Sequence, residues 1–257
     1  MSSIHPTAVV ASGAELGRDV EIGPYCVIGP QVRIGDNTVL KSHVVIDGRS
    51  VIGSGCTLFP FCSLGGQTQD LKYKGGATYV AIGDRTTIRE YVTVNSGTVD
   101  GEWTKVGAGC LIMATCHVAH GCEVGDEVIM ANGATLAGHV KVEDKAIIGG
   151  MSGVHQFCRI GSMAIVGGMT KVTQDLPPFL IADGNPGVIH GVNIVALQRR
   201  QVAEDVQKAI KAAFKLLYRS GLTTTEALAR IEAEIPAVPQ VAHLVQFVRA
   251  SERGILK

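Results

Sequence analysis

Four of the eight histidines lie in one stretch of the chain, and their spacing favours proton-transfer chemistry. They are His117, His120, His139 and His155. An imidazole has an ordinary pKa of about 6.5, so it is the natural general base near neutrality. Gly138 follows His120 by 18 residues, and its peptide N–H could face an oxyanion while His120 takes a proton. These groups suffice for acyl transfer without a covalent intermediate on the protein.

A period of six residues organises most of the chain that must position these groups. Aliphatic residues recur at every sixth position from Ile4 to Leu64 and, in the same phase, from Ile82 to Val172. The phase fails at three positions only, which are Asp70, Gly76 and Asp100. A period of six fits neither an α-helix nor a long alternating strand, and it is typical of β-helices. Each hexapeptide is therefore predicted to form a short strand and a turn, and three of them to close one triangular coil.

The repeat sets the predicted domain organisation. We expect an all-β solenoid, a parallel β-helix, over residues 1–190, with loops near residues 66–78 and 99–104 where the phase fails. A C-terminal α-helical domain is expected over residues 191–257, because the periodicity ends before Pro177-Pro178. On this spacing, His120, Gly138-His139 and His155 fall near one edge of the solenoid on successive coils.

The helical region carries recognisable start and stop signals. Val202 to Arg219 is amphipathic, and Ser220-Gly221 should end that helix. Thr223 and Glu226 have the spacing of a capping box for a further helix that ends before Pro236. A last helix is predicted over Val241 to Arg249.

Composition limits the partners. Lys plus Arg and Asp plus Glu are 23 each, so no net field favours nucleic acid or an anionic membrane. No stretch approaches the roughly 20 apolar residues that a membrane-spanning helix needs, and no leader-like segment opens the sequence. We therefore expect a cytoplasmic protein without membrane insertion.

The seven cysteines are best explained as core residues. They all occupy one phase of the repeat, the small inward position, where a thiol acts as a compact apolar group. Their positions are Cys26, Cys56, Cys62, Cys110, Cys116, Cys122 and Cys158. No two are 18 residues apart, which argues against disulfides between adjacent coils. A buried thiol stays neutral, so none is expected to be a nucleophile.

Several motifs together resemble the UDP-N-acetylglucosamine O-acyltransferases of lipid A synthesis. They are Asp70-Leu71-Lys72-Tyr73, Ile82-Gly83-Asp84-Arg85, Ile88-Arg89-Glu90, His117-Val118-Ala119-His120, Ala137-Gly138-His139-Val140, Val154-His155-Gln156-Phe157, Gly184-Asn185-Pro186, Gly191-Val192-Asn193, Arg199-Arg200, Tyr218-Arg219 and Arg253-Gly254-Ile255. The resemblance spans essentially the whole chain. It implies that the β-helix is left-handed, against the usual rule for parallel crossovers.

The resemblance also implies an activity and its partners. The enzymes of this family move a 3-hydroxyacyl group from acyl carrier protein to the 3-hydroxyl of UDP-N-acetylglucosamine. No cofactor beyond the carrier's phosphopantetheine arm is implied, and no metal. The site would lie between subunits of a homotrimer. The 3-amino analogue of the sugar remains an alternative acceptor.

Site residues are carried over position by position. His120 resembles the general base, and Gly138 would supply the oxyanion N–H. Residues that resemble those holding the nucleotide sugar are Asp70, Lys72, His117, His139, His155 and Gln156. Residues that resemble those reaching the uridine and pyrophosphate are Asn193, Arg199 and Arg200, and a guanidinium suits a bidentate grip on phosphate. The duller alternatives are solvated charges for Lys72 and the arginines, and a helix N-cap for Asn193.

The family sets acyl length with a ruler at the far end of the groove. Gly168 falls at that position, with Ile165 and Met169 close by. A residue without a side chain should let the acyl chain run deeper, so we predict a relatively long 3-hydroxyacyl group.

Three positions depart from the family pattern. Gly121 follows His120 where many relatives have Asp, so no carboxylate can orient the base from that position. Asn95 stands in Val94-Asn95-Ser96-Gly97-Thr98 where the family usually has Ile-His-Arg-Gly-Thr, and Val195 stands where Glu is common. These changes affect the expected contacts to sugar and nucleotide.

Two rival functions use the same fold. Histidines three apart, with others from a neighbouring chain, could bind zinc as in the γ-class carbonic anhydrases. A purely structural solenoid is the other rival, and clustered histidines together with paired arginines argue against it. A sister N-acyltransferase would be expected to carry an additional N-terminal domain, whereas here the repeats begin at Ile4.

Overall fold

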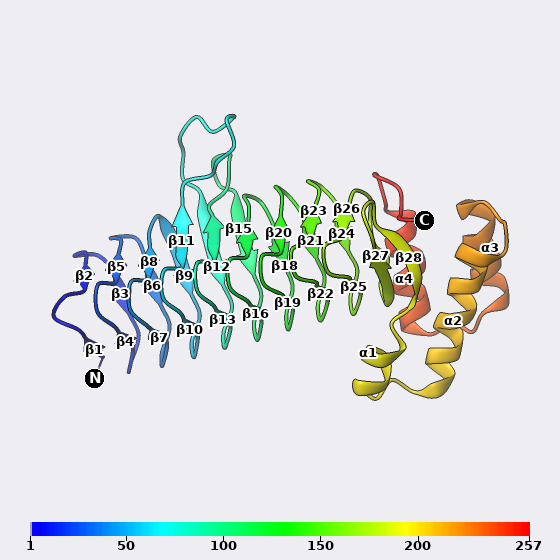
Figure 1. The fold of residues 1–257 in the computed structure, drawn as a ribbon, viewed down its shortest axis with the longest axis horizontal. Coiled ribbons are helices and arrows are strands. Elements are labelled where there is room, and N and C mark those ends of the chain that lie inside the picture. The colour runs from blue at the N-terminus through cyan, green and yellow to red at the C-terminus, as the bar shows by residue number, and fades with distance from the viewer. Residues whose placement is uncertain (1) are drawn as a thin grey trace.

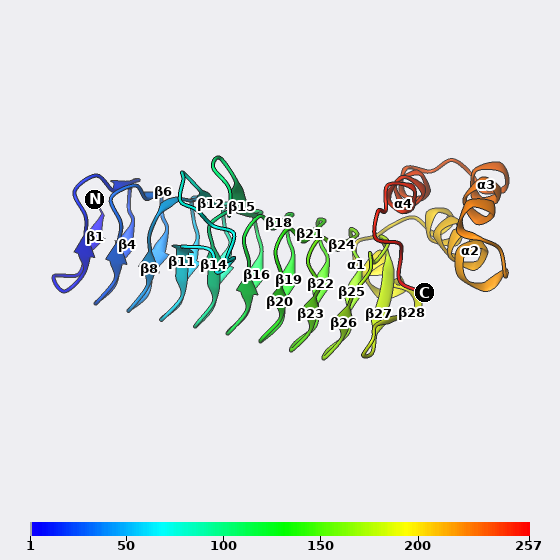
Figure 2. The ribbon, with the colours of Figure 1, turned by 90° about the horizontal axis from the view of Figure 1, so that it is seen from above.

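The computed structural model describes residues 2–257 and shows three parallel sheets wound into a prism, followed by helices (Figures 1 and 2). Up to Val172 consecutive strands enter the three sheets in turn, so neighbours within a sheet come from successive coils. The last two strands both join the first sheet and pair antiparallel. The first sheet contains β1 (Ser3–Ile4), β4 (Glu21–Ile22), β7 (Val39–Leu40), β10 (Thr57–Leu58), β13 (Thr87–Ile88), β16 (Leu111–Ile112), β19 (Ile129–Met130), β22 (Ile147–Ile148), β25 (Ile165–Val166), β27 (Leu180–Asp183) and β28 (Val188–Val192). The second contains β2 (Val9–Val10), β5 (Val27–Ile28), β8 (Val45–Ile46), β11 (Ser63–Gly66), β14 (Thr93–Asn95), β17 (His117–Val118), β20 (Thr135–Leu136), β23 (Gly153–Val154) and β26 (Lys171–Val172). The third contains β3 (Glu15–Leu16), β6 (Arg33–Ile34), β9 (Arg49–Ile52), β12 (Tyr79–Ile82), β15 (Trp103–Val106), β18 (Glu123–Val124), β21 (Lys141–Val142) and β24 (Arg159–Ile160).

The period of six is the reason for this architecture. Most aliphatic residues of the repeat end a strand and are buried, and each stacks on its equivalent in the next coil, as Val118 does on Leu136 and Leu136 on Val154. All three are at most 2% exposed. Stacking of buried aliphatic side chains supplies the apolar burial that drives folding, and the strand ladders satisfy the backbone.

The two segments where the phase fails leave the prism. Residues 67–78 connect β11 to β12 and project from the prism as a long loop (Figure 1). Residues 96–102 connect β14 to β15, and the hydroxyls of Thr68 and Thr98 lie 3.3 Å apart, which links the two segments. Both segments follow strands of the second sheet, so they meet at one edge of the prism.

The helical region begins directly after the last strand. It consists of α1 (Ile194–Arg199), α2 (Glu204–Arg219), α3 (Thr224–Glu234) and α4 (Pro239–Arg249). The predicted capping box at Thr223 and Glu226 is confirmed, because each side chain accepts the other's backbone N–H. The short helix α1 was not expected. The predicted division after residue 190 falls inside β28 and stays a prediction.

The helices close one end of the prism. Leu256 packs in the core of the β-helix, and Asp175 pairs with Ile255 through a β-bridge. His243 of α4 lies 2.7 Å from Glu143, whose carboxylate also accepts the N–H of Ser162. Among the described residues, no helix is both long enough and apolar enough to cross a membrane.

The cysteines lie where the repeat predicts them. All seven are free and buried. Burial raises the pKa of the Cys62 and Cys122 thiols to about 12, so both stay protonated at neutral pH. Their role as core residues is confirmed.

Candidate active site

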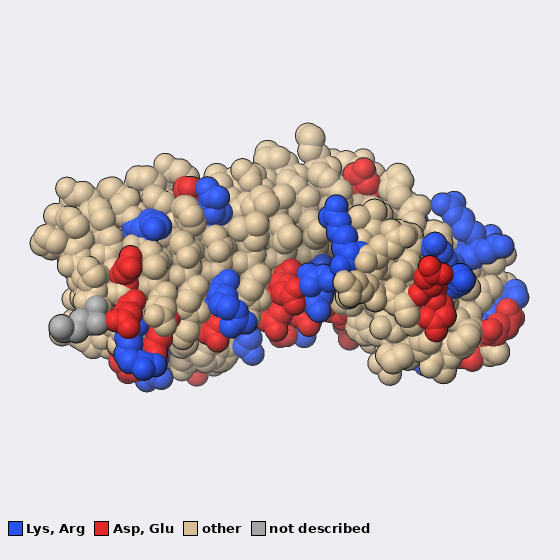
Figure 3. Space-filling model, turned by 90° about the horizontal axis from the view of Figure 1, so that it is seen from below, with Lys and Arg blue, Asp and Glu red and all other residues tan. Residues whose placement is uncertain are grey.

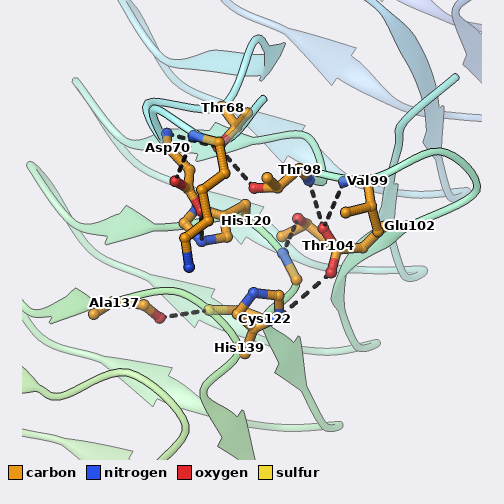
Figure 4. A network of polar contacts seen from close by, with 12 residues as sticks. Thr68, Asp70, Thr98, Val99, Glu102, Thr104, His120, Cys122, Ala137 and His139 are labelled. Atoms are coloured by element: carbon orange, nitrogen blue, oxygen red, sulfur yellow. Dashed lines mark hydrogen bonds and ion pairs between the residues drawn. The ribbon is translucent and has the colours of Figure 1, made fainter. Parts of the chain in front are cut away.

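A pocket of about 550 Å³ opens where the two loops meet the second sheet. Figure 4 shows Asp70, His120 and His139 close together there, with Glu102 approaching from the other loop. The residues that line the pocket are Gln69, Asp70, Leu71, Lys72, Asn95, His117, Ala119, His120, Ala137, Gly138 and Gln156. Four of the six predicted sugar-binding residues, Asp70, Lys72, His117 and Gln156, are therefore brought together, although they come from a loop and two different coils.

His120 and Gly138 face each other across adjacent coils. A Cβ placed on Gly138 would lie only 2.2 Å from Nε2 of His120, so only glycine leaves room for this ring. Among residues 2–257, no acceptor is bound by the N–H of Gly138. Nε2 of His120 thus lies close to the backbone of Gly138, whose N–H is free to bind a ligand, and an acid–base step beside an oxyanion requires both kinds of group.

The electrostatic surroundings keep His120 in its basic form. Burial and the neighbouring His139 lower the pKa of His120, and the positive charge of Lys72 acts in the same direction. The carboxylate of Asp70 opposes this shift, with Oδ2 at 3.5 Å from Nε2 of His120. Asp70 is itself held by its own loop, because Oδ1 accepts the N–H of Lys72. At neutral pH His120 is therefore ready to accept a proton.

The flanking histidines are fixed by different partners. Nδ1 of His117 lies 2.7 Å from the hydroxyl of Thr93, and burial lowers the pKa of His117. His139 stacks on Phe157 with ring centroids 5.0 Å apart and meets His120 edge to face, also at 5.0 Å. His117 lines the pocket, whereas His139 forms the wall behind the base.

Not every predicted site residue reaches this pocket. His155 is exposed and its Nδ1 lies 3.1 Å from the carbonyl of its neighbour Gln156, so the expectation that His155 joins the histidine groove is not met within one chain. Asn193 is buried and caps α1, with Oδ1 accepting the N–H of Ala196 and Nδ2 donating to the carbonyl of Met163. The structure thus gives Asn193 the N-cap role that was the alternative.

The arginines and the ruler residues lie elsewhere. Arg200 binds Glu127, which stands at the turn between the third and first sheets. Gly168 and Met169 stand at the turn between the first and second sheets, and both are exposed. The pocket lies at the remaining edge, between the second and third sheets. The predicted nucleotide and acyl contacts of a single chain are therefore on different edges from its base.

The metal alternative finds no support in the arrangement of ligands. In the part of the chain that the structure describes, no three or more His, Cys, Asp or Glu residues are grouped to hold an ion.

Sequence reasoning missed Glu102. Its carboxylate lies 3.3 Å from Nδ1 of His139 and is only 17% exposed. The signal was the lapse of the repeat near residue 100, which indicated a loop but not which of its side chains would turn inward. Gln69 was missed as well; its amide donates to Asn95 at 3.4 Å on the pocket wall.

Stacked hexapeptide coils, with His120 beside the backbone of Gly138 at one edge, are the architecture of hexapeptide-repeat transferases. The family profile described as "Bacterial transferase hexapeptide (six repeats)" matches residues 13–48 and 104–138. A second profile, "Udp N-acetylglucosamine O-acyltransferase; Domain 2", matches residues 175–256.

Comparison over full length gives the family. The chain is 47% identical over 258 residues to the acyl-[acyl-carrier-protein]–UDP-N-acetylglucosamine O-acyltransferase of Thermodesulfovibrio yellowstonii, and 49% identical over 263 residues to that of Verminephrobacter eiseniae, with all of each chain covered. The structure of LpxA from Acinetobacter baumannii superposes with a TM-score of 0.96 at 44% identity, covering 99% of both chains. LpxA from Bacteroides fragilis gives 0.97 at 40% identity, covering 99% of this chain and 100% of the other. The chain belongs to the UDP-N-acetylglucosamine O-acyltransferase family, and the predicted left-handed β-helix with a helical C-terminus is confirmed.

Proposed function

We propose that this protein transfers a (R)-3-hydroxyacyl group from acyl carrier protein to the 3-hydroxyl of UDP-N-acetylglucosamine, the reaction named for its relatives, as a step of lipid A biosynthesis. The observation that carries the mechanism is the close approach of His120 Nε2 to the backbone of Gly138, whose N–H has no partner among residues 2–257. One group removes a proton while the other stabilises the negative charge that results.

The steps follow from this geometry. His120 takes the proton of the sugar 3-hydroxyl, and the oxygen attacks the thioester carbonyl. The N–H of Gly138 donates to the carbonyl oxygen as it becomes negative. When the tetrahedral intermediate collapses, the C–S bond breaks and the imidazolium of His120 returns its proton to the leaving thiolate. Transfer is direct because the buried cysteines stay neutral, and the enzyme needs no metal or cofactor of its own.

The pocket supplies the groups that would hold the sugar. Asp70, Lys72, His117 and Gln156 line it together with the base. Of these, Lys72 is the group suited to phosphate, since an ammonium is a strong point charge for anions. His139 and His155 do not line this pocket within one chain, so their predicted roles in sugar binding have less support. His139 packs edge to face against His120, and His155 is exposed.

The active unit is proposed to be a homotrimer. The base, Arg200 and Gly168 occupy three different edges of one prism, so one bound substrate cannot touch all three within a chain. Parallel packing of prisms brings an edge of one copy beside a different edge of the next. Exposed apolar side chains along the edge of Gly168, among them Met151 at 70% and Met169 at 75%, suit such packing.

We propose that the protein works in the cytoplasm. The carrier protein is proposed to dock near the helices. Figure 3 shows Lys and Arg side chains gathered over the helical end of the molecule, although acidic side chains are interspersed. Arg199, Arg200 and Lys215 are the basic residues proposed to face an acidic carrier.

The first test is an acyl-transfer assay with UDP-N-acetylglucosamine and a series of 3-hydroxyacyl carrier-protein thioesters. His120→Ala should reduce kcat by about 10² to 10⁴, whereas His5→Ala, which changes an exposed histidine at the far end of the prism, should change it little. Inactive wild type with this sugar but active with the 3-amino analogue would reassign the acceptor. Inactivity with both, together with stoichiometric bound zinc, would favour the hydratase.

The second test addresses the shared site. Co-expression of a His120→Ala chain with an Arg199→Ala/Arg200→Ala chain gives mixed oligomers. If each site takes its base from one chain and its arginines from another, some interfaces carry neither lesion and activity reappears. If each site lay within one chain, every site would keep a lesion and the mixture would stay as inactive as its parents.

A further inference from the structure

Glu102 reaches the histidine pair from the segment that precedes β15, on the other side of His120 from Asp70 (Figure 4). Its two oxygens have different partners. Oε2 accepts the N–H groups of Thr98 and Val99, whereas Oε1 lies 3.3 Å from Nδ1 of His139. The side chain is 17% exposed. The loop thus holds one oxygen and aims the other at the imidazole.

Gly121 makes this approach possible. A Cβ on Gly121 would lie 2.9 Å from Oε1 of Glu102 and 2.4 Å from Nδ1 of His139, so a side chain there would occupy the same space as the carboxylate. The φ of Gly121 is +64°, and its N–H donates to Thr104 at 3.0 Å. Gly121, the residue after His120, carries no side chain, and the carboxylate of Glu102, from a different segment, occupies the space that a side chain there would take.

The contact with Glu102 favours a proton on Nδ1 of His139. An ionised carboxylate can only accept, so the approach of Oε1 to Nδ1 at 3.3 Å is favourable when this nitrogen carries hydrogen. The ring of His139 lies flat on Phe157 and edge to face with His120. The negative charge of Glu102 also favours a protonated His120, since it raises the pKa of that ring.

We propose that Glu102 is a positioning residue for the acyl-transfer step, which fixes the tautomer and orientation of His139 and stabilises the imidazolium of His120 as it forms. The inference rests on the proposed function, in which His120 is the general base. Glu102 does not line the pocket that contains His120, so it acts through the two histidines.

The first measurement needs only the wild type. Nitrogen-15 spectra of histidine-labelled protein, with His139 assigned by its loss in His139→Gln, should show hydrogen on Nδ1 of His139. Hydrogen on Nε2 instead would overturn the proposal, whether or not any Glu102 variant folds.

The second measurement is the pH profile of Glu102→Gln. The amide oxygen can still accept from Thr98 and Val99, so the loop keeps its anchor while the charge disappears and an N–H₂ turns to His139. We expect kcat to fall about tenfold with KM for the sugar nucleotide unchanged. The acid limb should move to lower pH by about 0.5 to 1 unit, because the charge that favours protonated His120 is gone.

Controls separate this from other causes. The remaining groups that face His120 are Asp70, Lys72, His117 and His139, and none of them is changed. Glu102→Asp keeps the charge and should keep the position of the acid limb. Glu123→Gln removes an exposed carboxylate of β18 and should leave rate and profile as they are.

The outcomes are distinct. A purely structural role for Glu102 predicts lower activity with an unmoved acid limb, and that result would overturn the proposal. Failure of the proposed function gives a different result, because full activity in His120→Ala would show that His120 is not the general base.

Discussion

The ring of His120 occupies the space that a side chain on Gly138 would need, with Nε2 only 2.2 Å from where a Cβ would stand. The proposed base and the proposed oxyanion donor therefore depend on each other, although they belong to successive coils. The first prediction follows from this relationship.

Gly138→Ala should displace the His120 ring and lower kcat by about 10² to 10³, while the melting temperature changes little because the ring can move into the open pocket. Gly153→Ala is the matched control, since a Cβ there meets nothing within 4 Å. Equal activity of the two variants would show that the close approach has no catalytic role.

The pH dependence of kcat/KM should report the lowered pKa of His120. Activity needs the unprotonated ring, so it should fall as pH drops through a pKa below the ordinary value of about 6.5. Lys72 helps to lower that pKa, so Lys72→Gln should move the acid limb to higher pH. Lys74→Gln, an exposed change in the same loop, should leave the limb unmoved.

Gly168→Met should shift the preferred donor to a shorter 3-hydroxyacyl chain. A Cβ at Gly168 meets only the carbonyl of Gly150, at 3.6 Å, so the fold should accept the change. The measurement is kcat/KM across a series of thioesters, with Gly191→Met, where a Cβ meets nothing within 4 Å, as control. An unchanged preference would remove Gly168 from the ruler.

His243 should stabilise the attachment of α4 at low pH. Glu143 raises the pKa of His243, so the ion pair contributes fully below about pH 6.5 and is lost as pH rises through the raised value. The pair is partly exposed, so we expect His243→Gln to cost about 0.5 kcal/mol, on the order of 1 to 2 °C in Tm, at pH 6 and less at pH 9. The exposed His190→Gln should show no such pH-dependent difference. A cost that grew with pH would contradict this assignment.

Carrier-protein docking should respond to charge at the helical end. Lys215→Glu is expected to raise KM for the acyl carrier protein several-fold at low salt and less at high salt, since salt screens exposed charges. KM for the sugar nucleotide should stay unchanged. Lys41→Glu, far along the prism, serves as control, and an equal effect of both would argue against a local docking surface.

The coil was predictable because its period is short and visible in the sequence: aliphatic residues at intervals of six mark the buried positions between Ile82 and Val172. The same arithmetic placed His120 and Gly138 on neighbouring coils. It did not place His155, whose ring turns away, or Glu102, because loops lie outside the repeat and their side chains are directed by tertiary contacts. Asn193 shows the limit of a motif, since one amide suits both a cap and a ligand.

The ladder that carries His120, Gly138 and Gln156 also sets a unit of length. Each coil advances by one strand spacing, about 4.8 Å, so equivalent residues along an edge are spaced at this interval. Adding or removing one such position requires a whole coil of three hexapeptides, whereas a single substitution changes the space at one position by less than a coil. Changes in the length of an acyl chain bound along an edge are therefore expected to evolve by point substitution, with the number of coils held constant.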